Sequence, residues 1–258
     1  AMGTRLRRPL LRDHGVASQL LRLAIVGMVV AAEARRVGVL LDLGASLVVH
    51  FSYFTTQASV LSGVVAIWLV AQPATHRPAW FDWLRAAVTT WILLAGVTYV
   101  TVLEPGSFLN PAEPFQSLVQ HQLVPLAMLV DWALTPGRTR TRRRRAWTWL
   151  IYPAAYAIVA VIVAQQIGAW LYPFLNPVAA DGWLGVAVQT AGVLAILVAL
   201  VVLVAVLAPP GSGPARRLRT RDARPGTPPE DQAAEASDAG VDPDREHLAA
   251  QEAPGSAR

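Results

Sequence analysis

The sequence predicts an all-α protein: a polytopic membrane bundle of six transmembrane helices with a disordered C-terminal tail. Of its 258 residues, 54% are hydrophobic and only 15% are charged, whereas soluble domains carry about 25% charged residues. The apolar residues fall in long runs, each near the ~20 residues needed to cross a bilayer. We therefore expect a basic cytoplasmic N-terminus at 1–17, a six-helix transmembrane domain at 18–208 and a disordered cytoplasmic tail at 209–258.

The six expected spans differ in strength. The first is the weakest, because Arg22 lies near its start and Glu33 interrupts its end. The second, FSYFTTQASVLSGVVAIWLVA, is strongly apolar beyond its first third, and the sixth is an almost unbroken Val/Leu/Ala run. Tryptophans near span ends form an expected aromatic belt: Trp80, Trp83, Trp147, Trp149, Trp170 and Trp183. The expected spans are 18–38, 51–71, 81–103, 115–135, 147–169 and 183–207.

The arginines predict the orientation of the chain. All 22 basic residues are Arg, and most lie before the first span, in the loop at 138–145 and after the sixth span. The loops at 104–114 and 170–182 contain no basic residue. Because short cytoplasmic loops carry the excess of basic residues, both termini are expected in the cytoplasm of a multi-pass cell-membrane protein. This placement favours membrane lipids over nucleic acid as partners.

The remaining composition excludes several classes of site. The tail from Pro209 onward is rich in Pro, Gly, Ala and charged residues, so it is not expected to fold. The chain has no Cys, which excludes disulfides and thiolate metal ligands. We predict neither a metal nor a cofactor.

Polar side chains form a stripe in the second span. Ser52, Thr55, Ser59 and Ser62 recur at steps of three and four, which places them on one helix face. Such groups are costly in hydrocarbon unless they face protein or water, so the stripe is either a packing seam that includes Gly63 or a site. Thr55 is a candidate nucleophile, although a threonine in a membrane helix commonly bonds its own i−4 carbonyl.

His121 is the one histidine of five that lies well inside an expected span. An ionisable group at that depth is a functional candidate, while the alternative is a structural hydrogen bonder. Pro125 removes the amide that would bond the His121 carbonyl, so a kink is expected there. At 1.5 Å per residue, Thr55 lies about 6 Å and His121 about 9 Å into their spans from the same side. A histidine beside a hydroxyl can act as its general base.

Other polar residues at similar depth are candidate contacts to a substrate or an oxyanion: Tyr53, Gln57, Ser59, Thr98, Thr101, Gln165 and Gln166. Asp131, at the end of the fourth span, is expected to pair with the arginines at 138–145 that follow it. Tyr152 and Tyr156 are expected to pack rather than to catalyse.

Four short motifs carry a resemblance to known families: FSYFTTQ (51–57), HQLVPLAMLVDW (121–132), YPAAY (152–156) and WLYPFLNP (170–177). They resemble those of a bacterial family of six-span integral membrane proteins that mostly lack an assigned function. They also resemble, more distantly, those of the androgen-induced membrane threonine hydrolases, which cleave fatty acid esters of hydroxy fatty acids. The resemblance implies that Thr55 is the nucleophile and that His121 is its partner, in the YFT and HQLVP contexts.

These observations leave two hypotheses open. The first is a membrane-embedded hydrolase in which Thr55 attacks a lipid-like ester and His121 takes its proton. The alternative is a non-catalytic membrane protein that binds or carries a lipid or small molecule, since the spans hold few ionisable residues. Haem-based electron transfer is disfavoured, because it would require a second histidine at the depth of His121.

Overall fold

The computed structural model describes residues 11–78, 80–105, 107–108, 114–137 and 143–208. Within these residues the chain is helical and forms no β-strand, which confirms the predicted all-α class. The first ten residues, most of the arginine loop (138–142) and the predicted tail (209–258) lie outside the described residues.

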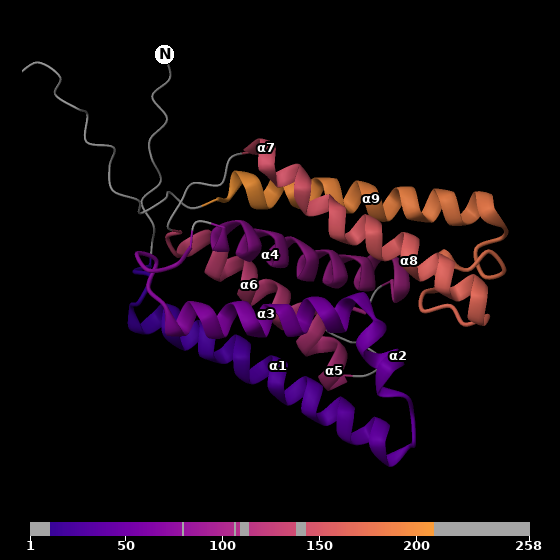
Figure 1. The fold of residues 1–258 in the computed structure, drawn as a ribbon, viewed down its shortest axis with the longest axis horizontal. Coiled ribbons are helices and arrows are strands. Elements are labelled where there is room, and N and C mark those ends of the chain that lie inside the picture. The colour runs from indigo at the N-terminus through magenta and orange to yellow at the C-terminus, as the bar shows by residue number, and fades with distance from the viewer. Residues whose placement is uncertain (1–10, 79, 106, 109–113, 138–142, 209–258) are drawn as a thin grey trace, which may run out of the picture. The chain divides into compact units, whose positions relative to one another are not determined.

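Six helical stretches cross the bundle in alternating directions (Figure 1). They are α1 (Val16–Asp42); α3 (Phe54–Ala71); α4 (Phe81–Thr98) with the π-helix η1 (Tyr99–Leu103); α5 (Pro114–Leu118) with the π-helix η2 (Val119–Leu123) and α6 (Val124–Leu134); α7 (Arg143–Ala146) with the 3₁₀ helix η3 (Trp147–Leu150) and α8 (Ile151–Ile167); and α9 (Trp183–Val206). Two short helices, α2 (Leu47–Ser52) and η4 (Pro173–Leu175), lie in connections.

Five of these stretches are long and apolar enough to cross a membrane. They are Val16–Asp42, Phe54–Ala71, Phe81–Leu103, Arg144–Ile167 and Trp183–Val206, close to five of the six predicted spans. The stretch from α5 to α6 is not among the five. It carries Gln120, His121 and Gln122 in succession, and these polar residues lower the hydropathy of its first half.

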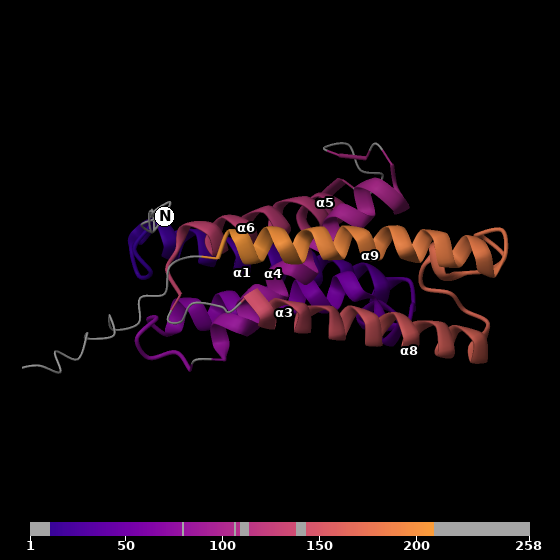
Figure 2. The ribbon, with the colours of Figure 1, turned by 90° about the horizontal axis from the view of Figure 1, so that it is seen from above.

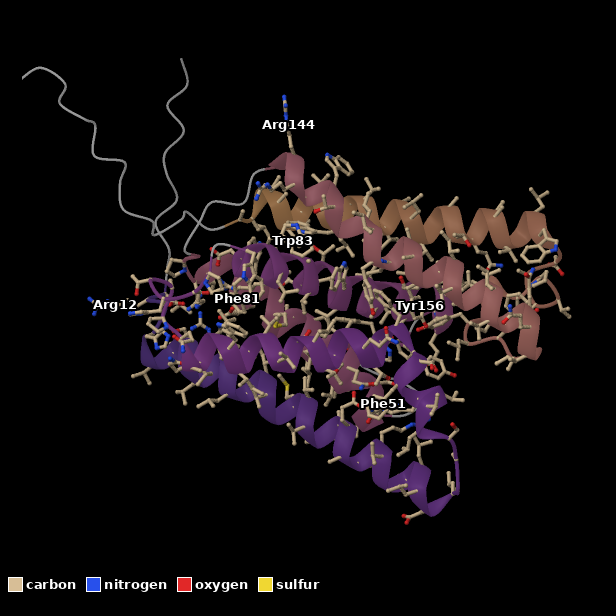
Figure 3. The ribbon with its side chains drawn as sticks, in the orientation of Figure 1. Arg12, Phe51, Phe81, Trp83, Arg144 and Tyr156 are labelled. Atoms are coloured by element: carbon tan, nitrogen blue, oxygen red, sulfur yellow. The ribbon has the colours of Figure 1, made fainter. Side chains whose placement is uncertain are left out.

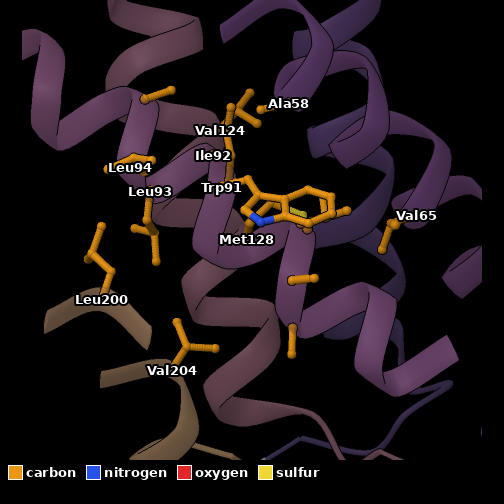
Figure 4. Close-up of a cluster of buried hydrophobic side chains, with 14 of the residues drawn as sticks. Ala58, Val65, Trp91, Ile92, Leu93, Leu94, Val124, Met128, Leu200 and Val204 are labelled. Carbon is orange, nitrogen blue, oxygen red and sulfur yellow. The ribbon is translucent and has the colours of Figure 1, made fainter. Parts of the chain in front are cut away.

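α4 is the central helix of the bundle. It packs against α3, α6 and α9, while α1 packs against α3 and α6. In Figure 1, α8 and α9 lie on one side of α4, and the view from above in Figure 2 shows both helices running along the bundle. Figure 4 shows the core, in which Ile92 of α4 lies near Ala58 of α3 and Val124 of α6, and Leu93 of α4 lies on the side of Leu200 of α9. α4, the most buried of the five candidate membrane helices, therefore makes the contacts that hold the bundle together.

Hydrogen bonds define two ends of the bundle. At the end that contains Asp131 (the Asp131 end), Arg22 of α1 and Arg85 of α4 both bond this residue of α6. At the end that contains Thr55 (the Thr55 end), Tyr156 of α8 bonds the first turn of α3. The starts of α1 and α4 and the ends of α3 and α6 thus share one end.

The second predicted span, 51–71, is interrupted at Tyr53. This residue has an extended backbone (φ −67°, ψ 136°), so α3 begins at Phe54 and the preceding residues form the separate helix α2. The Phe54 N–H, which a continuous helix would direct to the His50 carbonyl, donates instead to the hydroxyl oxygens of Tyr156 and Tyr172, at 3.1 and 3.0 Å. Thr55 is therefore the second residue of its helix rather than a residue one turn inside it.

The predicted aromatic belt is correct in part. Trp80, Trp147 and Trp183 are about half exposed near helix ends, as an interfacial position requires. Trp149 is fully buried, and its carbonyl accepts a 2.9 Å hydrogen bond from Trp91 Nε1 of α4. It belongs to the core rather than to a belt.

Candidate functional site

A cavity of about 320 Å³ lies between α3, α4, α8 and α9 near the Thr55 end. Its size falls within the ~300–1,000 Å³ typical of ligand pockets. The wall is mostly apolar, and within the described part of the chain it includes no Arg, His, Asp or Glu side chain. Five hydroxyl-bearing residues interrupt the apolar wall: Thr55, Thr98, Tyr156, Tyr172 and Thr190.

The first turn of α3 places Thr55 on this wall. Tyr156 and Tyr172 accept from the Phe54 N–H, and Tyr156 in turn donates to the Ser52 carbonyl at 2.8 Å. The Tyr172 hydroxyl also interacts with the backbone and side chain of Thr55. Figure 3 labels Tyr156 beside α3. These two tyrosines do more than pack: they fix where α3 begins and cap the N-terminus that carries Thr55.

His121 lies in a different cluster. Its ring stacks on Tyr99, with ring centroids 3.8 Å apart and an interplanar angle of 8°, and it does not line the cavity. The Tyr99 hydroxyl donates to a Glu104 carboxylate oxygen and lies 2.9 Å from Ser117 Oγ. The kink expected at Pro125 takes the form of η2, a π-helical segment that includes His121. The structure places Thr55 and His121 in two separately bonded clusters.

α4 and η2 approach each other closely behind this stack. A Cβ atom on Gly96 would lie 2.4 Å from the His121 carbonyl oxygen and 3.1 Å from Pro125 Cγ. Only a glycine permits this approach. Pro125 has no N–H to bond the His121 carbonyl. This carbonyl oxygen lies instead against the backbone of α4 at Gly96.

The remaining predicted contacts are dispersed. Tyr53 packs edge-on against Tyr172, with ring centroids 5.7 Å apart, and Gln57 accepts from the Tyr152 hydroxyl. Thr101 donates to the Val97 carbonyl on an exposed face, and Gln165 and Gln166 are exposed at the end of α8. Of all the predicted contacts, only Thr98 joins Thr55 on the cavity wall.

The polar stripe of the second span was expected to be either a packing seam or a site, and its residues fall into both classes. Ser59 and Ser62 are fully buried, and Ser62 donates to the Ala58 carbonyl at 2.8 Å. A Cβ atom on Gly63 would lie 3.2 Å from Val29 of α1, so small residues let α1 and α3 pack closely. This part of the stripe is a packing seam, whereas Thr55 faces the cavity.

The Asp131 end holds a buried ion cluster that the sequence reasoning did not predict. Asp131 pairs with Arg22 Nε at 2.9 Å and with Arg85 Nη2 at 2.6 Å, and all three side chains are almost wholly buried. Thr135 accepts from Arg85. The expected pairing of Asp131 with the arginines at 138–145 is wrong, since its partners come from α1 and α4. Their similar depth in the first, third and fourth spans is the signal that would have identified the cluster.

The segment before α1 extends this cluster. Asp13 lies 2.9 Å from Arg22 and 2.5 Å from Arg77, and it accepts from the Ala74 N–H at 2.6 Å. Leu11 N–H donates to the Leu134 carbonyl at 3.0 Å. Arg22 and Arg77 are therefore structural: both bond Asp13 and hold the segment 11–15 at the Asp131 end of the bundle.

A second polar cluster joins α1, α2 and η2. Glu33 accepts from Gln120 Nε2 at 2.6 Å and lies 2.8 Å from His50 Nε2. Glu33, which weakens the first span in the sequence, thus lies against protein rather than lipid. Among the described residues, no three His, Asp or Glu side chains are grouped closely enough to hold a metal ion.

Comparison of the chain with family models, with curated proteins and with solved structures finds no match.

Proposed function

We propose that this chain is a multi-pass protein of the cell membrane, with both termini in the cytoplasm, whose helix bundle binds a lipid or a lipid-like molecule. Five helices long and apolar enough to cross a bilayer support the membrane location. Exposed apolar side chains on the outer faces of these helices, such as Leu20, Ile162 and Val202, suit contact with acyl chains.

One observation carries the binding function: the 320 Å³ cavity has an apolar wall with a few hydroxyl groups. Apolar walls with a small number of placed polar groups are typical of small-molecule sites. The cavity also lies between helices whose outer faces are apolar, so an apolar ligand dissolved in the bilayer is the ligand class that best suits it.

Lipid retention tests this function. The full chain, purified in detergent, is expected to release a bound lipid on extraction, detected by mass spectrometry. Ala157 lines the cavity, and Ala157→Phe fills it and is expected to abolish the bound species. Ala155→Phe is the matched control, because Ala155 is exposed on the same helix and does not line the cavity. Equal lipid content in the two variants would refute binding in this cavity.

Hydrolysis of a fatty acyl ester is a second candidate function. The position of Thr55 on the cavity wall favours it, as does the resemblance of 51–57 and 121–132 to the threonine hydrolases. It ranks second because the described wall offers no proton acceptor for the Thr55 hydroxyl. Burial raises the pKa of the adjacent Tyr172, so this phenol stays protonated at neutral pH and is no base.

A fluorophosphonate probe tests the second candidate. If Thr55 is a nucleophile, the probe labels the parent protein, and Thr55→Ala and His121→Ala each abolish labelling. Thr101→Ala is the control, since Thr101 is exposed and bonds its own helix. Labelling of Thr55→Ala at the parent level would remove Thr55 from the mechanism and leave the binding function untouched.

A further inference from the structure

We infer that the cavity selects an uncharged amphiphile, such as a long-chain alcohol or a neutral ester, whose one polar group hydrogen-bonds Thr98 and Thr190. This inference rests on the proposed binding function and adds to it the class of ligand and the residues that recognise it.

The two threonines differ from most helical hydroxyls in the described part of the chain. Ser59 Oγ of α3 is also buried without a partner, but it does not line the cavity. Hydroxyl side chains within helices bond a carbonyl one turn back when they have no other partner. Thr98 Oγ1 and Thr190 Oγ1 are buried, line the cavity and have no hydrogen-bond partner among the described residues. The residues that do bond back to the carbonyl four positions earlier are Ser52, Ser62, Thr89, Thr90, Thr101 and Thr135.

A buried hydroxyl without a partner is unfavourable, so these two groups are poised to bond a ligand. Thr98 is only 7% exposed, which leaves the cavity as the place where a partner can be supplied. Each hydroxyl can donate or accept, and together they suit an alcohol or a carbonyl oxygen.

The charge of the wall excludes an ionised head group. No Arg, His, Asp or Glu side chain lines the cavity in the described chain. A carboxylate or an ammonium group would be desolvated there without a counter-charge, which is far more costly than burying a neutral hydroxyl. In contrast, the buried charges at the Asp131 end are paired with one another.

The wall also provides a place for the apolar chain of the ligand. From Thr98 towards the Asp131 end, Leu94 follows one turn away, about 6 Å at 1.5 Å per residue. On α9, Leu197 lies about 10 Å from Thr190 in the same direction. The volume of 320 Å³ is about twice the ~150 Å³ that holds one benzene, and so fits about a dozen non-hydrogen atoms. Decanol is of this size.

Two photoreactive probes of equal chain length test the inference on the purified full chain. One is a diazirine-bearing decanol and the other is the corresponding decanoic acid at pH 8, where its carboxyl group is ionised. The alcohol is expected to label α8 and α9 and to be displaced by unlabelled decanol. The acid is expected to label the same segments at least roughly tenfold less, because its charge would be buried unpaired.

Two substitutions separate recognition from folding. Thr98→Val and Thr190→Val keep the side-chain shape and remove the unpartnered hydroxyl. Each is expected to reduce alcohol labelling roughly three- to tenfold, as for one lost hydrogen bond. Neither should lower the melting temperature of the ligand-free protein. Thr90→Val on the same helix is the control: its hydroxyl bonds the Ala86 carbonyl, away from the cavity, and labelling should not change.

The outcomes distinguish the two proposals. If neither probe labels the cavity helices, the proposed binding function fails and the inference fails with it. If the acid labels as strongly as the alcohol, or both Val variants label like the parent, binding stands and the inference of a neutral head group bound by Thr98 and Thr190 is overturned.

Discussion

At the scale of single residues, the strongest constraint is the burial of charge. Asp131 is 1% exposed and is the carboxylate that pairs with both Arg22 and Arg85. Charges at such sites are tolerated only when they are paired and hydrogen-bonded. The stability of this end of the bundle therefore depends on one side chain to an unusual degree.

Asp131→Asn tests this dependence. It keeps the size of the side chain and removes its charge, which leaves the buried Arg85 guanidinium without its bonded carboxylate and leaves Arg22 with Asp13 alone. Breaking a buried pair costs about 3–5 kcal/mol, so a marked fall in melting temperature is expected, measured by tryptophan fluorescence in detergent. Arg144→Gln, at an exposed position, should leave the melting temperature unchanged. A D131N protein as stable as the parent would show that the cluster is not structural.

Gly96 offers a second test at this scale. A methyl group there would lie 2.4 Å from the His121 carbonyl, and the obstacle is backbone, which cannot rotate away. We expect Gly96→Ala to destabilise the fold by about 1–3 kcal/mol, as overpacking does, and to lower the melting temperature. Gly192→Ala is the control, because nothing lies within 4 Å of its added Cβ atom. Equal melting temperatures for the two variants would show that α4 and η2 do not approach each other this closely.

Sequence reasoning identified Thr55 and Thr98 as polar residues of one depth, and the cavity brings these two together. It could not identify Tyr172 as a contact of Thr55, because that tyrosine comes from a connection far along the chain. It also grouped Gln165 with the candidate contacts by depth alone. Depth does not report which way a side chain points, and Gln165 is exposed.

At the scale of elements, most helices lie where the hydropathy pattern predicts, whereas their interruptions are not apparent from it. The break at Tyr53 depends on hydrogen bonds that the Phe54 N–H donates to Tyr156 and Tyr172, which lie about a hundred residues away. The π-helices η1 and η2 meet through the stack of Tyr99 on His121. Pro125 predicts an irregularity, but only the tertiary packing decides that it becomes a π-helix.

The segment 11–15 permits a test by pH. Burial opposes ionisation of Asp13, yet Arg77 and Arg22 outweigh it and hold the pKa of Asp13 below its ordinary value of 3.8. A lowered pKa means that this carboxylate stabilises the fold at pH values above 3.8, and that the contribution is lost as pH falls through the lower folded-state value. The parent is expected to lose melting temperature over that acid range.

Asp13→Asn should have a lower melting temperature than the parent already at pH 7. Its melting temperature should then fall less than that of the parent as the pH is lowered, because the variant has no Asp13 carboxylate to protonate. The measurement is melting temperature against pH for both proteins. Identical pH profiles for the parent and the variant would show that Asp13 does not hold the segment 11–15 in place.

At the scale of the whole molecule, alternation of the helical stretches brings the starts of α1 and α4 and the end of α6 to one end of the bundle. The side of the membrane that this end faces is still a prediction, made from the arginine pattern. The hydropathy and loop charges thus suffice for the order of the helices. They do not predict which helix is central, because α9 is more apolar than α4 and yet is far less buried.

The absence of cysteine makes the orientation testable with single thiols. Val178 is 87% exposed in the connection between α8 and α9, and Arg144 is exposed at the start of α7. In intact cells, a membrane-impermeant maleimide is expected to label Val178→Cys, whereas Arg144→Cys should react only after permeabilisation. The reverse pattern would invert the proposed orientation, and labelling of both in intact cells would contradict a crossing between them.

The pairing of Arg85 with Asp131 also has a consequence for biosynthesis. The two residues are 46 positions apart, on successive crossings of the bundle. At about 5–20 residues per second, the ribosome makes Arg85 about 2–9 s before it reaches Asp131. During that interval the newly made α4 carries a cation with no counter-ion in hydrocarbon. We therefore expect α4 to enter the bilayer together with α6, as a helical hairpin.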